Sequence, residues 1–598
     1  MQDGLLTMVT IKNISVTPDV VSHNGKHDIS VSCIVFTANE KASIESVFID
    51  LYHSQLFSHY PMTPIQILQP TNDGEYSGTF SIPILMDTGV YHLPIVAIDS
   101  LNSTGRSIGQ FSVTYSHNND SPFIYSSEFK TQFETITQTS FIPNNAIEVL
   151  ENGNHALLKR LELIQSAKKQ INLQTYILGH TGDGGKLLDA LLQKSDEGVE
   201  VNIILNADTQ IPTSAISTLR LKMNQYFHEL AREDESGIIE WISNDILDNR
   251  LKSLNKTGGI NLVLFDAGLL KNEEICPVSN QKQTDHWLEK SFKEVIPQLN
   301  DLTRPKDWQA FFKGPGGLPS LPLLDYAIHE KIMVVDDQFA IVGGRNLEDH
   351  YFSSWVDLDL FIQGPLVQNI QDGFFKTFQL ITTNMDNERK SPITSPCESK
   401  DNCLAMFIQS RPWKREYQTL HSLIYAIQCS KKRICIRSQY VVLPDSLLRD
   451  ALMDAVRRGV VVRIITNSYR TSKKLNMGAG YYVTLHHLEK LLDAGIQVFE
   501  HKGIDKEDVV QPYHHTKEFI FDGHLCAIGS FNLSLRSCYI ESENLVYICD
   551  PLFSAKREVQ FLSDMNCQTI EITNAYYADL KKQFKRRIEL SQYVDLLF

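Results

Sequence analysis

The sequence contains no apolar run that approaches the roughly 18 to 20 residues a helix needs to cross a bilayer. Its opening stretch, MQDGLLTMVTIKN, has neither the charged start nor the apolar core of a Sec-type signal peptide. The 10 cysteines are scattered without the spacing of metal ligands, and several of them, such as Cys435 and Cys526, lie in apolar runs typical of buried thiols. These absences predict a chain without a transmembrane segment or a zinc site, suited to a reducing compartment.

Positive charge is also scarce. The chain has 56 Lys and Arg residues against 71 Asp and Glu, which gives a formal net charge of −15. A protein that follows a phosphate backbone usually presents a basic face, so this balance disfavours nucleic acid as a partner. The hydrophobic content of 42% is that of a globular protein, and 598 residues are too many for one core. We therefore expect several domains.

A short motif occurs twice with the same spacing, between His329 and Asn346 and between His515 and Asn532. Each copy has an apolar run after the lysine, a turn that begins at an aspartate, and a second apolar run, which predicts a β-hairpin that returns the chain beside the histidine. Two unrelated hairpins with core histidines are the alternative, and identical spacing disfavours it. The members are His329, Lys331, Asp336, Gly343, Gly344 and Asn346 upstream, and His515, Lys517, Asp522, Gly529, Ser530 and Asn532 downstream.

The doubled pattern H-x-K-x4-D-x6-G-[S/G]-x-N resembles the phospholipase D superfamily. Within it, the run Gly343-Gly344-Arg345-Asn346 and the downstream GSFN resemble the bacterial cardiolipin synthase and phospholipase D-like group. The resemblance covers the chain from about Asn145 onward. It implies two similar α/β lobes about a pseudo-twofold axis, a phosphodiesterase or phosphatidyltransferase that needs no metal or other cofactor, a phospholipid substrate at a membrane surface, and water or an alcohol as acceptor.

The domain organisation follows from changes in pattern along the chain. The first part has short β-rich runs separated by turn clusters such as Asn72-Asp73-Gly74, which predicts an all-β, immunoglobulin-like sandwich. Two later stretches, 161–178 and 423–443, both read as a helix running into a buried strand. The predicted domains are the sandwich at 1–118, a linker at 119–144, lobe 1 at 145–390 with an insertion at about 206–320, a linker at 391–404, and lobe 2 at 405–598.

The paired histidines suit a two-step displacement at phosphorus. One, neutral, attacks to form a phosphohistidine, and the other protonates the leaving oxygen. The two lysines and two asparagines of the motif copies would hold the non-bridging oxygens. Asp357 and Glu543 each lie eleven residues after an asparagine of the motif. By resemblance Glu543 orients His329 and Asp357 orients His515, while solvated acids at strand ends are the alternative.

The remaining motif residues have smaller expected roles. Asp336 and Asp522 lie at turns, where a carboxylate can bond backbone amides, so we expect them to be structural. Gly344 and Ser530 differ between the copies and are assigned to substrate binding. The residues after the first copy predict either an amphipathic mouth or plain core, and they are His350, Tyr351, Phe352 and Trp355.

Several questions stay open at this level. The motif copies are symmetric, but the resemblance favours His329 as nucleophile, with His515 kept protonated by Asp357. Hydrolysis to phosphatidic acid and cardiolipin-type transfer differ only in the acceptor. The alternatives in function are a nuclease of the same superfamily and a catalytically degenerate membrane-docking protein. A cytoplasmic or peripheral membrane location and export as an effector without a cleaved signal both fit, and neither the headgroup nor the oligomeric state is determined.

Overall fold

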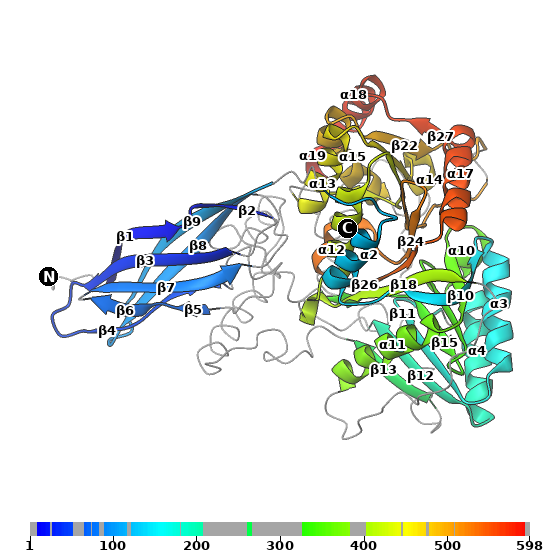
Figure 1. Cartoon of the computed structure of the whole chain (residues 1–598), viewed down its shortest axis with the longest axis horizontal. Coiled ribbons are helices and arrows are strands. Elements are labelled where there is room, and N and C mark those ends of the chain that lie inside the picture. The colour runs from blue at the N-terminus through cyan, green and yellow to red at the C-terminus, as the bar shows by residue number, and fades with distance from the viewer. Residues whose placement is uncertain are drawn as a thin grey trace.

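The protein consists of a β-rich N-terminal part that lies to one side of a larger α/β body (Figure 1). The computed structural model describes residues 9–23, 27–51, 65–72, 74–82, 89–115, 121–179, 181–206, 260–265, 326–382, 402–414, 416–443, 446–473, 478–506 and 509–591.

The N-terminal part contains two sheets that share one core. Their strand orders are β1-β3-β7-β6 and β2-β9-β8-β4-β5. In β3, buried Ile29, Val31, Cys33 and Val35 alternate with more exposed neighbours, so one face of the sheet points into the core. The described residues of this part are rich in strands, and the all-β, immunoglobulin-like sandwich stays a prediction. The strands are β1 (Val9–Thr17), β2 (Val20–Ser22), β3 (His27–Thr37), β4 (Ile44–Asp50), β5 (Ile65–Ile67), β6 (Gln69–Asn72), β7 (Glu75–Ile82), β8 (Gly89–Asp99) and β9 (Thr104–Thr114).

The first lobe of the body contributes one half of a 16-stranded sheet. Its elements are β10 (Ile142–Leu150), α3 (Gly153–Ser166), β11 (Gln170–Thr175), α4 (Gly182–Asp196), β12 (Glu200–Asn206), β13 (Ile260–Phe265), β14 (Ala327–Ile328), β15 (Ile332–Val335), β16 (Phe339–Gly343), α10 (Asp349–Ser353), β17 (Asp359–Gln363) and α11 (Leu366–Thr382).

The second lobe contributes the other half. Its elements are β18 (Cys403–Ser410), a 3-10 turn (Pro412–Lys414), α12 (Gln418–Cys429), β19 (Arg433–Arg437), β20 (Val441–Val442), α13 (Leu447–Arg457), β21 (Val461–Thr466), α14 (Tyr469–Lys473), α15 (Gly478–Asp493), β22 (Gln497–His501), β23 (Glu518–Phe521), β24 (Leu525–Gly529), β25 (Leu533–Ser534), α16 (Leu535–Tyr539), β26 (Glu541–Ile548), α17 (Pro551–Gln568), β27 (Thr569–Glu571), α18 (Asn574–Gln583) and α19 (Lys585–Ser591).

The strand order is nearly the same when read outward from the centre of the sheet. From β10 it runs β17, β16, β15, β11, β12, β13, and from β18 it runs β26, β24, β23, β19, β21, β22. In both halves the three outermost of these strands are parallel, and the hairpin that follows each H-x-K motif is antiparallel. Strands of both lobes also share one hydrophobic cluster that includes Val334, Ile362, Ile520 and Val546. The two similar lobes predicted from the sequence therefore form one continuous sheet.

The aspartate of each motif copy anchors this hairpin to the neighbouring loop. The Asp336 carboxylate accepts hydrogen bonds from the backbone N–H groups of Lys168, Lys169 and Gln170 at 2.7 to 3.0 Å. Asp522 does the same in lobe 2, at 2.8 to 2.9 Å, with the N–H groups of residues 431–433. Both aspartates have a positive φ, 53° and 52°, which suits a turn. These contacts agree with the structural role expected for both residues.

The linker predicted at 119–144 is wrong over most of its length. It contains α2 (Ser127–Thr137), on which Phe129 and Phe133 are fully buried in the core of lobe 2. Phe129 stacks on Tyr425 of α12, with ring centroids 5.6 Å apart, and the two helices lie side by side (Figure 1). The polar residues of α2 face outward, so its composition reads as a loop, while two phenylalanines four residues apart form the packed face.

The insertion predicted at about 206–320 lies largely outside the described residues. Its described part is β13, which pairs in parallel with β12 and occupies the place that β22 has in lobe 2. β13 is therefore part of the sheet of lobe 1. The linker predicted at 391–404 also lies largely outside the described residues, and Cys403 and Leu404 already belong to β18.

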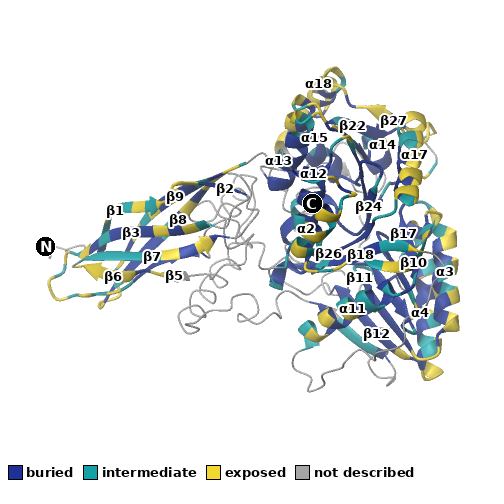
Figure 2. Ribbon diagram, viewed as in Figure 1, coloured by how far each residue is buried: buried dark blue, intermediate teal, exposed yellow. Residues whose placement is uncertain are grey.

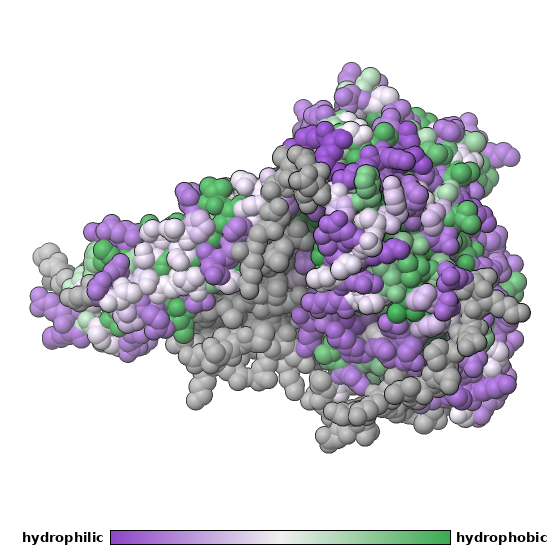
Figure 3. All heavy atoms as spheres, in the orientation of Figure 1, coloured by the Kyte–Doolittle hydropathy of each residue, from purple (hydrophilic) through white to green (hydrophobic). Residues whose placement is uncertain are grey.

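The strands of the body are mostly buried and its helices carry the exposed residues (Figure 2). On the face in Figure 3, hydrophilic residues cover much of the described surface and hydrophobic residues appear in separate groups. No helix in the described part of the chain is long and apolar enough to cross a membrane.

Replacing Asp522 with Asn should lower stability without changing the chemistry of the site. The amide retains one acceptor oxygen and places an NH₂ group against a backbone N–H, so we expect a loss of about 1–3 kcal/mol in the free energy of unfolding. Thermal melting measures this, and kcat per folded molecule should be unchanged. Asp505→Asn is the matched control, because the Asp505 side chain is 94% exposed. A wild-type melting temperature for Asp522→Asn would contradict the anchoring role.

Candidate active site

Each H-x-K segment leads into a strand and is held by the backbone of the opposite lobe. The His329 N–H donates to the carbonyl of Ser542, where β14 pairs in parallel with β26. The His515 N–H donates to the carbonyl of Val356, and the Val356 N–H donates to the carbonyl of Tyr513. Ser542 and Val356 directly precede the two acidic residues singled out in the sequence. Their carbonyls therefore place each histidine beside an acid of the other lobe.

Both histidine rings contact those acids. His329 Nδ1 lies 3.1 and 3.2 Å from the two carboxylate oxygens of Glu543. His515 Nδ1 lies 2.7 Å from Oδ2 of Asp357. Glu543 and Asp357 are fully buried, so they are not solvated acids at strand ends. A proton on Nδ1 that is donated to the carboxylate leaves Nε2 of each ring as the reactive nitrogen.

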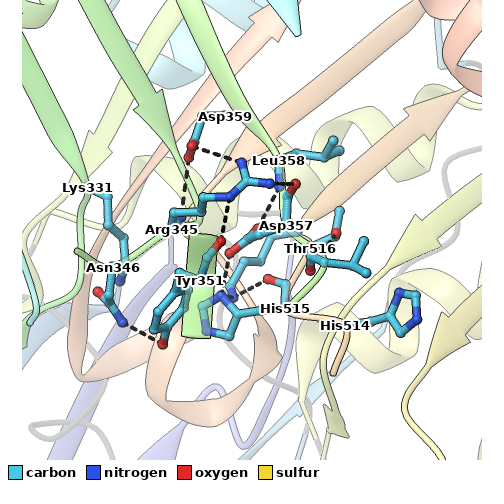
Figure 4. Close-up of polar contacts among 12 residues, drawn as sticks. Lys331, Arg345, Asn346, Tyr351, Asp357, Leu358, Asp359, His514, His515 and Thr516 are labelled. Atoms are coloured by element: carbon cyan, nitrogen blue, oxygen red, sulfur yellow. Dashed lines mark hydrogen bonds and ion pairs between the residues drawn. The ribbon is translucent and has the colours of Figure 1, made fainter. Parts of the chain in front are cut away.

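The lysines and asparagines of both copies are buried in the same region. Lys331 and Lys517 each donate from Nζ to the backbone carbonyl of the histidine two residues before. Lys517 Nζ also lies 2.8 Å from Nδ1 of His515, a contact that can be a hydrogen bond only while Nδ1 carries no proton. Figure 4 shows Lys331, Asn346 and Tyr351 of lobe 1 grouped near His515 of lobe 2. Cationic and amide donors therefore converge where an anionic group would bind.

Burial controls the protonation of these groups. It lowers the pKa of His329 and of His515, and the nearby lysine charges lower both further. It also raises the pKa of Asp357. The expectation that Asp357 keeps His515 protonated is therefore not supported for the ligand-free protein, because desolvation of the imidazolium outweighs the nearby carboxylate.

The lysines are affected in the same way. Burial lowers the pKa of Lys331 to about 8 and of Lys517 to about 7, from an ordinary value of 10.5. The nearby carboxylates, Glu543 for Lys331 and Asp357 for Lys517, oppose this shift. The site is thus poised to gain positive charge when a phosphate anion enters and compensates for the burial.

Gly344 and Ser530 both contact the acids and not an open site. A Cβ on Gly344 would lie 2.4 Å from Oδ1 of Asp357, so only glycine allows that carboxylate to approach. The Ser530 hydroxyl donates to Glu543 and accepts from the N–H of Asn544. Its single proton is directed at the carboxylate and not at a substrate oxygen. These contacts suit residues that position the acids, and the substrate-binding role of both residues stays a prediction.

One group of described residues has the spacing of a cation site. Possible ligand atoms of His329, Glu541 and Glu543 lie within 4.8 Å of one another. Arg536 pairs with Glu541 at 2.9 Å, and the Ser537 hydroxyl donates to Glu543. Both carboxylates are therefore already engaged, in an arrangement that explains the group without an ion.

Aromatic residues from both lobes surround the histidines. Tyr351 and Trp355 contact the His515 ring, with centroids 5.0 and 5.5 Å away, and Tyr176 contacts His329 at 5.4 Å. Phe352 instead belongs to the core of lobe 1. Of the residues after the first motif, Tyr351 and Trp355 therefore lie beside the site, whereas Phe352 is a core residue.

Sequence reasoning missed three residues of the site, Ser537, Glu541 and Tyr440. Ser537 matches Tyr351 in the aligned motif copies, and Glu541 lies two residues before Glu543, so both could have been found by comparing the copies. Tyr440 lies 75 residues before His515 and outside the motif. Only the pairing of β20 with β25 brings it close.

Comparison with known proteins finds similarity to cardiolipin synthases. The family described as "Cardiolipin synthase, PLD-like domain" matches residues 161–296 and 423–565, one segment in each lobe. The chain is 23% identical to a cardiolipin synthase of Oceanobacillus iheyensis over 445 aligned residues. This alignment covers 73% of this chain and 72% of that protein. It is 22% identical over 442 residues to a cardiolipin synthase of Clostridium perfringens strain SM101, 72% of each chain.

Among solved structures, a phosphatidylserine synthase of Haemophilus influenzae Rd KW20 aligns with a TM-score of 0.48 and 14% identity, over 79% of this chain and 100% of that one.

The second matched segment includes the whole downstream motif. The upstream motif has the same spacing as the downstream motif at every position. Both copies retain histidine, lysine and asparagine in one buried site. The chain belongs to the phospholipase D superfamily, as a phosphodiesterase or transphosphatidylase similar to cardiolipin synthases.

Proposed function

We propose that the protein transfers a phosphatidyl group from one phospholipid headgroup to the hydroxyl of another, through a phosphohistidine. The observation that carries this proposal is the pair of buried histidines, each on a carboxylate of the opposite lobe, with the buried lysines of both motif copies nearby. The similarity to cardiolipin synthases over nearly three quarters of the chain supports a phosphatidylglycerol donor and acceptor.

The first step breaks the bond between phosphorus and the leaving alcohol. Nε2 of one histidine attacks phosphorus, the alkoxide departs, and the second histidine gives it a proton. In the second step that histidine takes a proton from the incoming hydroxyl, whose oxygen displaces the first imidazole from phosphorus. With water as acceptor the same two steps give phosphatidic acid. The lysines stabilise the charge on the non-bridging oxygens in both steps.

The surroundings of the two rings differ, and this difference supports a separate role for each ring. His329 Nδ1 lies near two carboxylates, Glu543 at 3.1 Å and Glu541 at 3.7 Å, which makes its ring electron-rich. His515 lies beside the ammonium of Lys517, which makes its imidazolium a stronger acid. We therefore assign His329 as the nucleophile and His515 as the acid and base. The negative charge of the bound phosphodiester raises the pKa of His515 and so favours the protonated form that the first step needs.

Vesicles that contain phosphatidylglycerol should yield cardiolipin and free glycerol. Lipid mass spectrometry measures both, and a chelator should not change the yield, because side chains fill every role in the mechanism. His329→Asn and His515→Asn should each abolish turnover, since each step requires both rings. Phosphatidic acid as the sole product would identify a hydrolase. Cleavage of DNA but not of any phospholipid would contradict the proposal.

The covalent intermediate should form on His329. Quenching under acid-free conditions preserves a phosphohistidine, and peptide mapping locates it. His515→Asn, which retains the nucleophile, should accumulate the adduct with an activated donor, whereas His329→Asn should give none. An adduct on His515 in the wild-type enzyme would reverse the two roles.

The pH dependence should follow the two lysines. Because burial depresses their pKa values, both ammonium groups are charged only below about pH 7, and kcat/KM should fall as the pH rises above about 7, where Lys517 loses its charge first. Lys517→Arg keeps its charge at every accessible pH, so the alkaline decline should move toward the pKa of Lys331. A kcat/KM profile on a soluble short-chain substrate tests this, because it reports groups of the free enzyme. A wild-type profile that is flat to pH 10 would contradict the lowered pKa values of both lysines.

A further inference from the structure

The asparagine of each motif copy contacts a buried tyrosine hydroxyl. Asn346 Nδ2 lies 2.8 Å from the hydroxyl of Tyr351, as Figure 4 shows, and Asn532 Nδ2 lies 3.3 Å from the hydroxyl of Tyr440. Both asparagines and both tyrosines are buried. The same contact is thus present in each half of the site.

The two tyrosines come from positions that do not correspond. Tyr351 lies on α10, five residues after Asn346, whereas the residue five after Asn532 is Ser537, which donates to Glu543. Tyr440 directly precedes β20, whose Val441 pairs with Leu533 beside Asn532. In lobe 1 the matching bridge joins Leu178 to Leu347, so the residue that corresponds to Tyr440 is Ile177. Because duplication cannot account for the match, each lobe obtains the same contact in a different way.

The amides are only half satisfied in this arrangement. The carbonyl oxygens of Asn346 and Asn532 are both buried, and neither has a hydrogen-bond partner among the described residues. Such an oxygen beside a phosphate anion would be repelled, and a buried acceptor without a partner costs about 1–3 kcal/mol. A half-turn of the amide exchanges its oxygen and nitrogen without changing its shape. The tyrosine hydroxyl can then donate to the oxygen, and the NH₂ group faces the phosphate.

We propose that Tyr351 and Tyr440 are positioning residues that hold the amides of Asn346 and Asn532 with their NH₂ groups directed at the non-bridging oxygens of the substrate. This inference rests on the proposed phosphoryl transfer. Burial raises the pKa of both phenols well above the ordinary value, so each remains a neutral donor throughout the working pH range.

The tyrosines therefore act through the asparagines and not on the substrate. Removing a hydroxyl should lower kcat by roughly 10-fold or more, less than the 10² to 10³ typical of losing a direct donor, and should leave KM nearly unchanged.

Double-mutant cycles test this dependence. Tyr351→Phe and Asn346→Ala should each lower kcat, and the double variant should be no slower than Asn346→Ala alone, because the hydroxyl has no amide left to orient. Tyr440→Phe and Asn532→Ala give an independent cycle in lobe 2, so poor folding of one variant leaves the other test intact. Tyr577→Phe is the control: it removes a buried hydroxyl that donates to the carbonyl of Leu485 in lobe 2.

The outcomes separate this inference from the proposed function. If Asn346→Ala and Asn532→Ala both keep wild-type kcat, the proposed phosphate site itself is wrong. If they lose activity but the effects of the Tyr→Phe changes multiply with theirs, or if both Tyr→Phe variants match Tyr577→Phe, the tyrosines do not position the amides.

Discussion

The site depends on an exchange of contacts between the two lobes. His329 donates its backbone N–H to the carbonyl of Ser542, and its ring contacts the carboxylate of the following residue, Glu543. His515 makes the same two contacts with Val356 and Asp357. Neither lobe alone contains a histidine with its acid. The pairing of β10 with β18 joins the two lobes in one sheet and so fixes the position of one lobe relative to the other. Any change in the packing of the lobes would therefore alter both rings together.

Burial is what makes this arrangement both costly and reactive. Two lysines, two histidines and two carboxylates lie in one region that water scarcely reaches, and breaking one buried charged pair typically costs about 3–5 kcal/mol. Behind the site, Arg345 and Arg160 both bond Asp359, and Arg345 also donates to the carbonyl of Asp357. This second layer of charges holds Asp357 in place. The same desolvation keeps both imidazoles neutral until an anion enters, which is the state a nucleophile needs.

The two halves of the site solve the same problem with different residues. In lobe 1 a short acid, Asp357, lies against Gly344, while in lobe 2 a longer acid, Glu543, is held by the hydroxyls of Ser530 and Ser537. Ser537 occupies the position in lobe 2 that corresponds to Tyr351, and the tyrosine that contacts the asparagine of lobe 2 is Tyr440. These differences remove the symmetry of the motif. They also place a second carboxylate, that of Glu541, near His329 and the ammonium of Lys517 beside His515.

Local pattern in the sequence was enough to identify the residues that repeat at fixed spacing. The motif copies, the two lobes and the acids eleven residues after each asparagine follow from local pattern and from duplication, because both are preserved along the chain. Tertiary structure decided what depends on distant partners: that Phe129 and Phe133 bury against Tyr425 and turn a polar linker into a packed helix, that Ser530 bonds Glu543, and that Tyr440 meets Asn532. The protonation of His329 and His515 also depends on tertiary structure. Burial and the charges of nearby lysines set it, and the spacing of residues along the chain does not reveal either.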